Sequence, residues 1–149
     1  MSAEQVVRDF LNTFETQGVE PAIPYLADSL GLSAVNPPLQ GGKQEFIGQG
    51  ALIKEAMPDY RWGVQTMNTQ GNQITVTMRW TGTHSGILRL SGFVPGAPDV
   101  PPSGKKLSVA DKFIFTVQGD KITRVHIDSP TDGGLVGMLQ QLGIQLPSA

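Results

Sequence analysis

Residues 73–84 read QITVTMRWTGTH and have the clearest pattern in the chain. Apolar side chains recur at every second position, and polar side chains, mostly threonine, fill the positions between them. This period of two predicts a β-strand with one buried face. The apolar face would carry Ile74, Val76, Met78 and Trp80, with His84 at its end.

Further strand patterns surround this one. Strands are expected at residues 60–67, 87–94, 107–117 and 121–128. Turn residues separate them at 68–72 and at Gly119-Asp120, which is typical of a hairpin. Four prolines predict an irregular loop at 95–105, because proline cannot donate to a sheet ladder.

The first third of the chain predicts helices instead. Residues 3–17 have an apolar stripe at helical spacing and a capping serine at Ser2, and residues 21–30 and 43–57 give two further helices. Residues 31–42 are expected to be a loop, and a short helix should close the chain. Helices followed by strands predict an α+β fold, with the helices on one face of an antiparallel sheet.

Composition narrows the class of protein. A length of 149 residues suits one domain spanning 1–149, and a net charge of -2 gives no basic footprint for nucleic acid. The chain has no cysteine, and its two histidines are too far apart for common ligand spacings, so no metal site is expected. No apolar run suggests a signal peptide or membrane span, so the expected location is cytoplasmic, without membrane contact.

Five segments together carry a family resemblance. They are residues 57–61 (MPDYR), 79–86 (RWTGTHSG), 101–106 (PPSGKK), 119–122 (GDKI) and 140–143 (QQLG). In this order the chain resembles the SnoaL-like polyketide and ester cyclases of the nuclear transport factor 2-like superfamily. The resemblance implies a cone-shaped barrel, in which a strongly curved antiparallel sheet wraps around about three N-terminal helices.

The resemblance also implies a deep pocket for a small hydrophobic ligand, often within a homodimer. Polyketide cyclases of this type use no metal or cofactor. A pocket carboxylate removes a proton from a carbon between two carbonyls, and the enolate closes the ring by an aldol step. A carboxylate whose pKa is raised by desolvation is an adequate base for such an acidic carbon.

The resemblance points to Asp128 as the first candidate base. The last strand of the family often carries His-Trp-Asp, and His126-Ile127-Asp128 matches it after a one-residue shift. Strict alternation would place Ile122, Arg124, His126 and Asp128 on one face. That face could line the pocket, or it could face solvent or a dimer partner.

Asp111 is the second candidate base. It interrupts a strand row that otherwise contains Leu107, Val109, Phe113 and Phe115. A carboxylate in an apolar row is costly unless it is paired or functional. Asp111 could therefore be a base with a raised pKa, or it could pair with a neighbouring cation. The family motif places its own acid at the position of Phe113.

The remaining candidates would bind substrate. His84 could donate to a ligand carbonyl, or it could hold its turn by bonding backbone. The aromatic candidates for a pocket wall are Tyr60, Trp62, Trp80 and Phe113, although such side chains often serve packing alone.

Two functions remain open from the sequence. One is a cofactor-free acid–base enzyme, such as a cyclase, isomerase, hydratase or ester hydrolase, acting on a small apolar carbonyl compound. The other is a binding module of the same fold that holds a small ligand or a partner protein.

Overall fold

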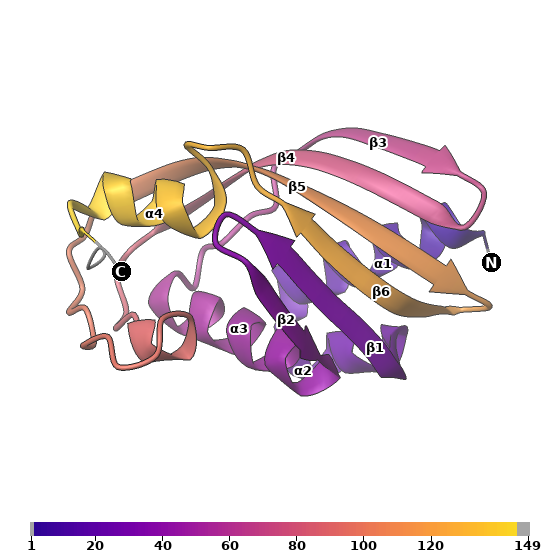
Figure 1. Cartoon of the computed structure of the whole chain (residues 1–149), viewed down its shortest axis with the longest axis horizontal. Helices are drawn as coiled ribbons and strands as arrows, with labels where there is room; N and C mark the ends of the chain where they lie inside the picture. The colour runs from indigo at the N-terminus through magenta and orange to yellow at the C-terminus, as the bar shows by residue number, and fades with distance from the viewer. Residues whose placement is uncertain (1, 146–149) are drawn as a thin grey trace.

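The computed structural model describes residues 2–145, and a six-stranded sheet forms its centre (Figure 1). The strand order is β2-β1-β6-β5-β4-β3. The strands are β1 (Leu26–Val35), β2 (Leu39–Gly42), β3 (Val64–Gln70), β4 (Gln73–Thr83), β5 (Lys106–Gln118) and β6 (Lys121–Asp128). β1 runs parallel to β6 and the other neighbours are antiparallel, so the sheet is mixed rather than purely antiparallel as expected.

Helices cover one face of this sheet. α1 (Ala3–Gln17) packs against β4, β5 and β6, and α3 (Lys43–Ala56) packs against β1 and β2. The short α2 (Val19–Ala22) follows α1, and α4 (Gly134–Leu142) packs on one end of β5 (Figure 1). Two 3-10 turns, Ile23–Tyr25 and Leu90–Gly92, complete the described elements. No helix among residues 2–145 is long and apolar enough to cross a membrane.

The helix predicted at residues 3–17 is confirmed. The Ser2 hydroxyl accepts a hydrogen bond from the Gln5 amide at 3.1 Å and so caps the first turn. Gly18, with φ at 94°, ends the helix. The buried stripe consists of Val6, Val7, Phe10, Leu11 and Phe14.

The predictions for residues 26–42 are wrong. Instead of the end of a helix and a loop, the chain forms β1, a turn and β2. β1 has an irregularity between Leu26 and Gly31, and its buried residues Leu26, Leu30 and Leu32 skip the exposed Asp28, so that the first two are four residues apart. That spacing resembles a helical turn, and pairing with the distant β6 decides the outcome.

Two predicted strands also differ. The predicted strand at 87–94 is a 3-10 turn with one isolated bridge from Leu88 to Val100. β3 begins only at Val64, because Gly63 has φ at 58° and a Cβ there would lie 2.1 Å from the Arg79 carbonyl oxygen. The proline-rich loop, the hairpin turn and the closing helix agree with the predictions.

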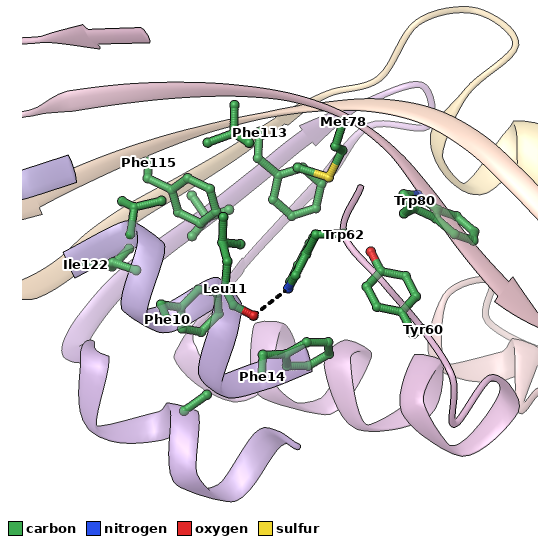
Figure 2. Packing of buried hydrophobic residues seen from close by; sticks show 14 of the residues in the cluster. Phe10, Leu11, Phe14, Tyr60, Trp62, Met78, Trp80, Phe113, Phe115 and Ile122 are labelled. Carbon is green, nitrogen blue, oxygen red and sulfur yellow. Dashed lines mark hydrogen bonds between the residues drawn. The ribbon is translucent and has the colours of Figure 1, made fainter. Parts of the chain in front are cut away.

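β4 and β5 form the predicted alternating pair. Their inward residues face one another, with Ile74 opposite Phe115, Val76 opposite Phe113, Met78 opposite Asp111 and Trp80 opposite Val109. Aromatic side chains from α1 and the segment before β3 meet this pair in the core (Figure 2). The Trp62 indole donates to the Leu11 carbonyl oxygen at 3.0 Å, which joins that segment to α1.

The single face predicted for Ile122, Arg124, His126 and Asp128 is wrong, because β6 contains an extra residue. Val117 pairs with Ile122 and Thr116 pairs with Arg124, so Thr123 bulges out of the ladder. Beyond the bulge the alternation is reversed. Ile122 and Val125 are both fully buried, and the outer face carries Arg124, His126 and Asp128.

Candidate functional site

A cavity of about 170 Å³ lies between the helices and the inner face of the sheet. Its volume resembles that of an engineered cavity of about 150 Å³ that holds benzene. Most of its walls are apolar. The lining includes Phe10, Phe14, Phe46, Ile47, Ile53, Tyr60, Trp62, Trp80, Phe93, Phe113, Ile127, Leu135 and Met138.

The cavity extends to the turn between β1 and β2. Val35, which is 42% exposed, lines it together with Asn36 and Pro37, so the cavity reaches the surface here. The Asn36 side-chain amide donates to the carbonyl oxygens of Pro130 and Thr131, at 2.9 and 3.3 Å. These bonds hold the turn beside the segment that leads into α4 (Figure 1).

α3 provides the wall opposite the sheet. Its apolar side chains Phe46, Ile47 and Ile53 are only half-buried, and Ala56 alone in this helix is fully buried. These side chains of α3 thus line the cavity, while the helix also packs against β1 and β2. This arrangement leaves room for a ligand between α3 and the aromatic side chains of the core.

Asp111 brings a carboxylate into this apolar space. Its side chain is 8% exposed, and Oδ1 accepts hydrogen bonds from the Ser129 hydroxyl at 2.8 Å and the Lys112 amide at 2.9 Å. Both bonds end on Oδ1, whereas Oδ2 lies 3.6 Å from the place where a Cβ of Gly134 would stand. The Trp80 side chain also donates to this carboxylate, and Oδ2, which can accept two hydrogen bonds, keeps capacity for a ligand.

Burial raises the pKa of Asp111 above its ordinary value. Hydrogen bonds from Ser129, the Lys112 amide and the side chain of Trp80 oppose this shift, and the charge of Asp128 adds to it. A carboxyl group with a raised pKa binds a proton more readily than an ordinary aspartate. Such a group is suited to taking and returning a proton.

Tyr60 provides a hydroxyl group in the same cavity. Burial, then the charges of Asp111 and Glu15, raise the pKa of Tyr60 well above its ordinary value, so the phenol stays protonated. Its ring lies 5.3 Å from the Trp62 ring and 5.4 Å from the Trp80 ring. Figure 2 shows the hydroxyl directed toward the sheet rather than toward α3.

The structure brings Asp111 together with all four aromatic candidates. Tyr60, Trp62, Trp80 and Phe113 all line the cavity beside it. Both tryptophans of the chain are in this set. Their fluorescence should therefore respond to a bound ligand.

Asp128 and His126 lie on the other face of the sheet. Asp128 Oδ2 is 3.6 Å from the Lys112 ammonium, and His126 Nδ1 is 2.7 Å from the Ser33 hydroxyl. Neither residue lines the cavity. Because of the bulge at Thr123, Asp128 and His126 lie on the face of the sheet opposite to the Asp111 side chain.

His84 also lies away from the cavity lining. It is 1% exposed, its Nδ1 accepts from the Ser103 amide at 3.3 Å, and the Ser103 hydroxyl is 2.8 Å from the same nitrogen. His84 thus holds the end of the proline-rich loop. Within residues 2–145, no group of three acidic, histidine or cysteine side chains is placed to hold a metal ion.

Two residues of the site were missed by sequence reasoning. Ser129 bonds the candidate carboxylate, and Gly134, with φ at 56°, leaves space for both. A Cβ at Gly134 would lie 2.2 Å from the Ser129 hydroxyl oxygen. The pair of glycines before the closing helix was the available signal, because two glycines at a helix start often permit a close approach.

The sequence and the structure were compared with known families and known proteins, and one family model matches. A model of the SnoaL-like domain matches residues 7–125. No curated protein matches the sequence. Solved structures do match, with low identity over nearly the whole chain.

Three of these structures show the range of similar proteins. Wild-type IdmH from Streptomyces antibioticus, a candidate polyketide cyclase, has a TM-score of 0.72 at 19% identity, over 97% of this chain and 100% of that chain. AclR from Streptomyces galilaeus, a candidate hydroxylase, has a TM-score of 0.73 at 11% identity, over 97% and 84%. A protein with a ketosteroid isomerase-like fold from Catenulispora acidiphila, in complex with trimethylamine, has a TM-score of 0.67 at 13% identity, over 97% and 96%.

At such low identities these likenesses show the fold alone. The cone-shaped α+β fold expected from the sequence is confirmed. The sheet of the described chain is open rather than closed into a barrel, because β2 and β3 are its two edges.

Proposed function

The chain belongs to the SnoaL-like domain family, and on this premise we propose that it is a cofactor-free acid–base enzyme acting on a small, mostly apolar carbonyl compound. One observation carries the proposal: a carboxylate that is 8% exposed stands in the wall of an otherwise apolar cavity. A buried charge of this kind destabilises a fold, and ionisable groups in such surroundings cluster at functional sites. Cyclisation and isomerisation are the reactions that this site suits best.

In the proposed reaction Asp111 is the catalytic base. Its Oδ2 takes a proton from a carbon next to a carbonyl, and the electron pair of that C–H bond shifts into the carbonyl to give an enolate. The Tyr60 hydroxyl donates a hydrogen bond to the enolate oxygen and so stabilises its charge. In a cyclisation the enolate carbon bonds to a second carbonyl carbon, and the new alkoxide takes the proton from Asp111. In an isomerisation the proton returns to another carbon.

The aromatic side chains serve binding in this proposal. Trp62, Trp80 and Phe113 form apolar surfaces against which a ring could lie, beside the carboxylate. Exclusion of water by these walls strengthens both the hydrogen bond from Tyr60 and the basicity of Asp111. The cavity volume favours a ligand of one or two rings.

Proton exchange tests this proposal without knowledge of the natural substrate. The ketone 2-tetralone would be incubated with the protein in D2O, and the loss of its α-protons followed by NMR. We expect wild-type protein to accelerate exchange, and the Asp111→Asn variant to lose about 100-fold or more of that acceleration. Asp128→Asn is the matched control, because its carboxylate lies on the opposite face of the same sheet.

Two results would count against the proposal. One is full acceleration by a folded Asp111→Asn protein, which would remove Asp111 from the reaction. The other is loss of acceleration in Asp128→Asn alone, which would return the role of base to the last strand.

A non-enzymatic binding module is the second candidate. The position of the family acid favours it, because Asp128 lies outside the cavity and the bulge at Thr123 keeps it there. Native mass spectrometry of the purified protein would then detect a bound small molecule, while no carbonyl compound is converted or exchanged.

Two further parts of the proposal concern the oligomeric state and the cellular location of the protein. We propose a homodimer, as the family resemblance implies, and a cytoplasmic location. Size-exclusion chromatography with light scattering tests the first, and fractionation of the source cells tests the second. A monomer at micromolar concentration would contradict the dimer.

A further inference from the structure

The charges around the cavity are unevenly distributed. None of the side chains that line it belongs to lysine, arginine or histidine, and Asp111 is the one acidic residue among them. The nearby cations are engaged elsewhere. The ammonium of Lys112 lies near Asp128 on the opposite face. That of Lys54 donates to the carbonyl oxygens of Glu15 and Pro58 and lies 5.8 Å from the centre of the Phe14 ring, outside the set of lining residues.

The groups around Asp111 do not neutralise it either. β4 contributes Met78 and Trp80, and α4 approaches with Gly134. The titratable groups that act on it are Asp128 from β6 and Tyr60 from the segment before β3, one an acid and the other a neutral phenol. An ionised Asp111 therefore has hydrogen-bond donors but no cationic partner among the described residues.

This arrangement has a consequence for ligands. A carboxylate or phosphate in the cavity would lose its water, meet a second negative charge at close range, and find no cation to offset either effect. Like charges that are buried together repel strongly because the surrounding dielectric is low. An uncharged carbonyl group suffers neither penalty, and it can accept a hydrogen bond from Tyr60.

We propose that Asp111 also determines specificity, by admitting uncharged ligands to the cavity and rejecting anionic ones. The substrate would thus enter as a ketone, ester or amide, and a compound bearing a free carboxylate in the buried part would be excluded. This inference rests on the proposed function only for the place where the ligand binds, not for its conversion.

A pair of compounds with nearly the same shape tests the proposal. Cyclohexyl methyl ketone and cyclohexanecarboxylate differ by a methyl group in place of a charged oxygen, and neither absorbs where tryptophan fluoresces. Binding at pH 7 would be measured by the change in fluorescence of Trp62 and Trp80, with ligand-observed NMR as a second readout.

We expect the ketone to bind wild-type protein at least about 10-fold more tightly than the carboxylate. In Asp111→Asn the difference should shrink by about 3-fold or more, because the repulsion is removed while the cost of desolvating the carboxylate remains. Asp111→Leu, checked for folding by circular dichroism, serves if the Asn variant does not fold. Asp128→Asn should keep the wild-type preference, since its carboxylate lies outside the cavity.

Three results would overturn the proposal: equal or tighter binding of the carboxylate by wild type, an undiminished preference for the ketone in both Asp111 variants, or no binding of either compound. Proton exchange separates this inference from the proposed function. Selective binding of the ketone without any exchange would leave the charge selection standing and remove the enzyme. Exchange that requires Asp111, with no selection between the two compounds, would support the enzyme and remove the charge selection.

Discussion

The carboxylate of Asp59 accepts two hydrogen bonds from Thr83, one from its backbone amide at 2.7 Å and one from its hydroxyl at 2.8 Å. Asp59 follows the end of α3, and Thr83 is the last residue of β4. The pair therefore joins the helix layer to the sheet. These bonds, the one from the amide above all, lower the pKa of Asp59 below its ordinary value.

Removal of this contact should destabilise the protein in a pH-dependent way. We expect Asp59→Ala to lower the free energy of unfolding at pH 7 by about 1 kcal/mol, a modest value because the carboxylate is exposed to solvent. Since folding lowers the pKa, the contribution is present above the unfolded value of 3.8 and is lost as pH falls through the folded value. Urea unfolding at pH 7 and at about pH 2 measures both. The exposed Asp99, with one ion pair at 3.7 Å, gives a control variant that should change little.

Two glycine substitutions should have opposite effects. Gly134→Ala would force a Cβ to within 2.2 Å of the Ser129 hydroxyl oxygen at a positive φ, and we expect a loss of about 1–3 kcal/mol. Gly48→Ala lies within α3 with nothing within 4 Å of its Cβ, and we expect a gain of about 0.5–1 kcal/mol. Thermal unfolding of both variants checks the signs. A stabilised Gly134→Ala protein would contradict the described contact between Ser129 and α4.

Asp111→Asn should stabilise the protein at neutral pH. Folding raises the pKa of Asp111, so the folded state binds the proton more tightly, and stability falls as pH rises from 3.8 through the folded pKa. An uncharged asparagine lacks this penalty. The melting temperature of the variant should exceed that of wild type at pH 7, with a smaller difference near pH 4. A lower melting temperature at pH 7 would mean that the charged form is stabilised rather than strained.

His84 should make stability depend on pH between about 7 and 5. Burial lowers the pKa of His84, with a partly opposing effect of the Val100 carbonyl, so the unfolded chain takes up a proton first. Stability should therefore decline as pH falls below the unfolded value of 6.5. Denaturant titrations of His84→Gln should show a shallower decline. His126→Gln on the outer face is the control, and an unchanged slope in His84→Gln would exclude His84 as the source.

Local pattern predicted the elements whose burial is regular. β4 and β5 each bury every second side chain over most of their length, so a period of two was readable in the sequence. α1 was equally clear, because its buried stripe and cap are local features. The position of Asp111 followed from the same regularity, since it falls in the buried row of β5.

Elements that depend on pairing with distant segments could not be predicted from the local sequence pattern. β1 leaves Asp28 exposed within its buried row, and its ladder is completed by β6, which lies almost a hundred residues away in the sequence. The partners of Asp111 were missed for a related reason. Ser129 and Gly134 come from the segment after β6, and only the packing of α4 on β5 brings them to the carboxylate.

Several residues in the segments that carried the family resemblance stabilise the fold, whereas Tyr60 and Trp80 in the same segments line the cavity. Asp59 bonds Thr83, and His84 bonds Ser103. The Gln141 side chain both accepts from the Ser108 amide at 3.0 Å and donates to its carbonyl oxygen at 2.7 Å, where it takes the place of a neighbouring strand. Because these contacts stabilise the fold and do not involve the cavity, the residues that make them indicate the family but not the reaction.

The bulge at Thr123 determines which side chains of β6 face the cavity. If Thr123 instead paired with Thr116 in a regular ladder, the same residues from Arg124 to Asp128 would each move one position along β5 and turn to the opposite face. Loss of the bulge, without loss of any residue, would thus exchange Asp128 for Ile127 in the cavity wall. Equivalent positions in this strand are defined by their distance from the bulge, and an alignment that ignores it would compare the inside of one protein with the outside of another.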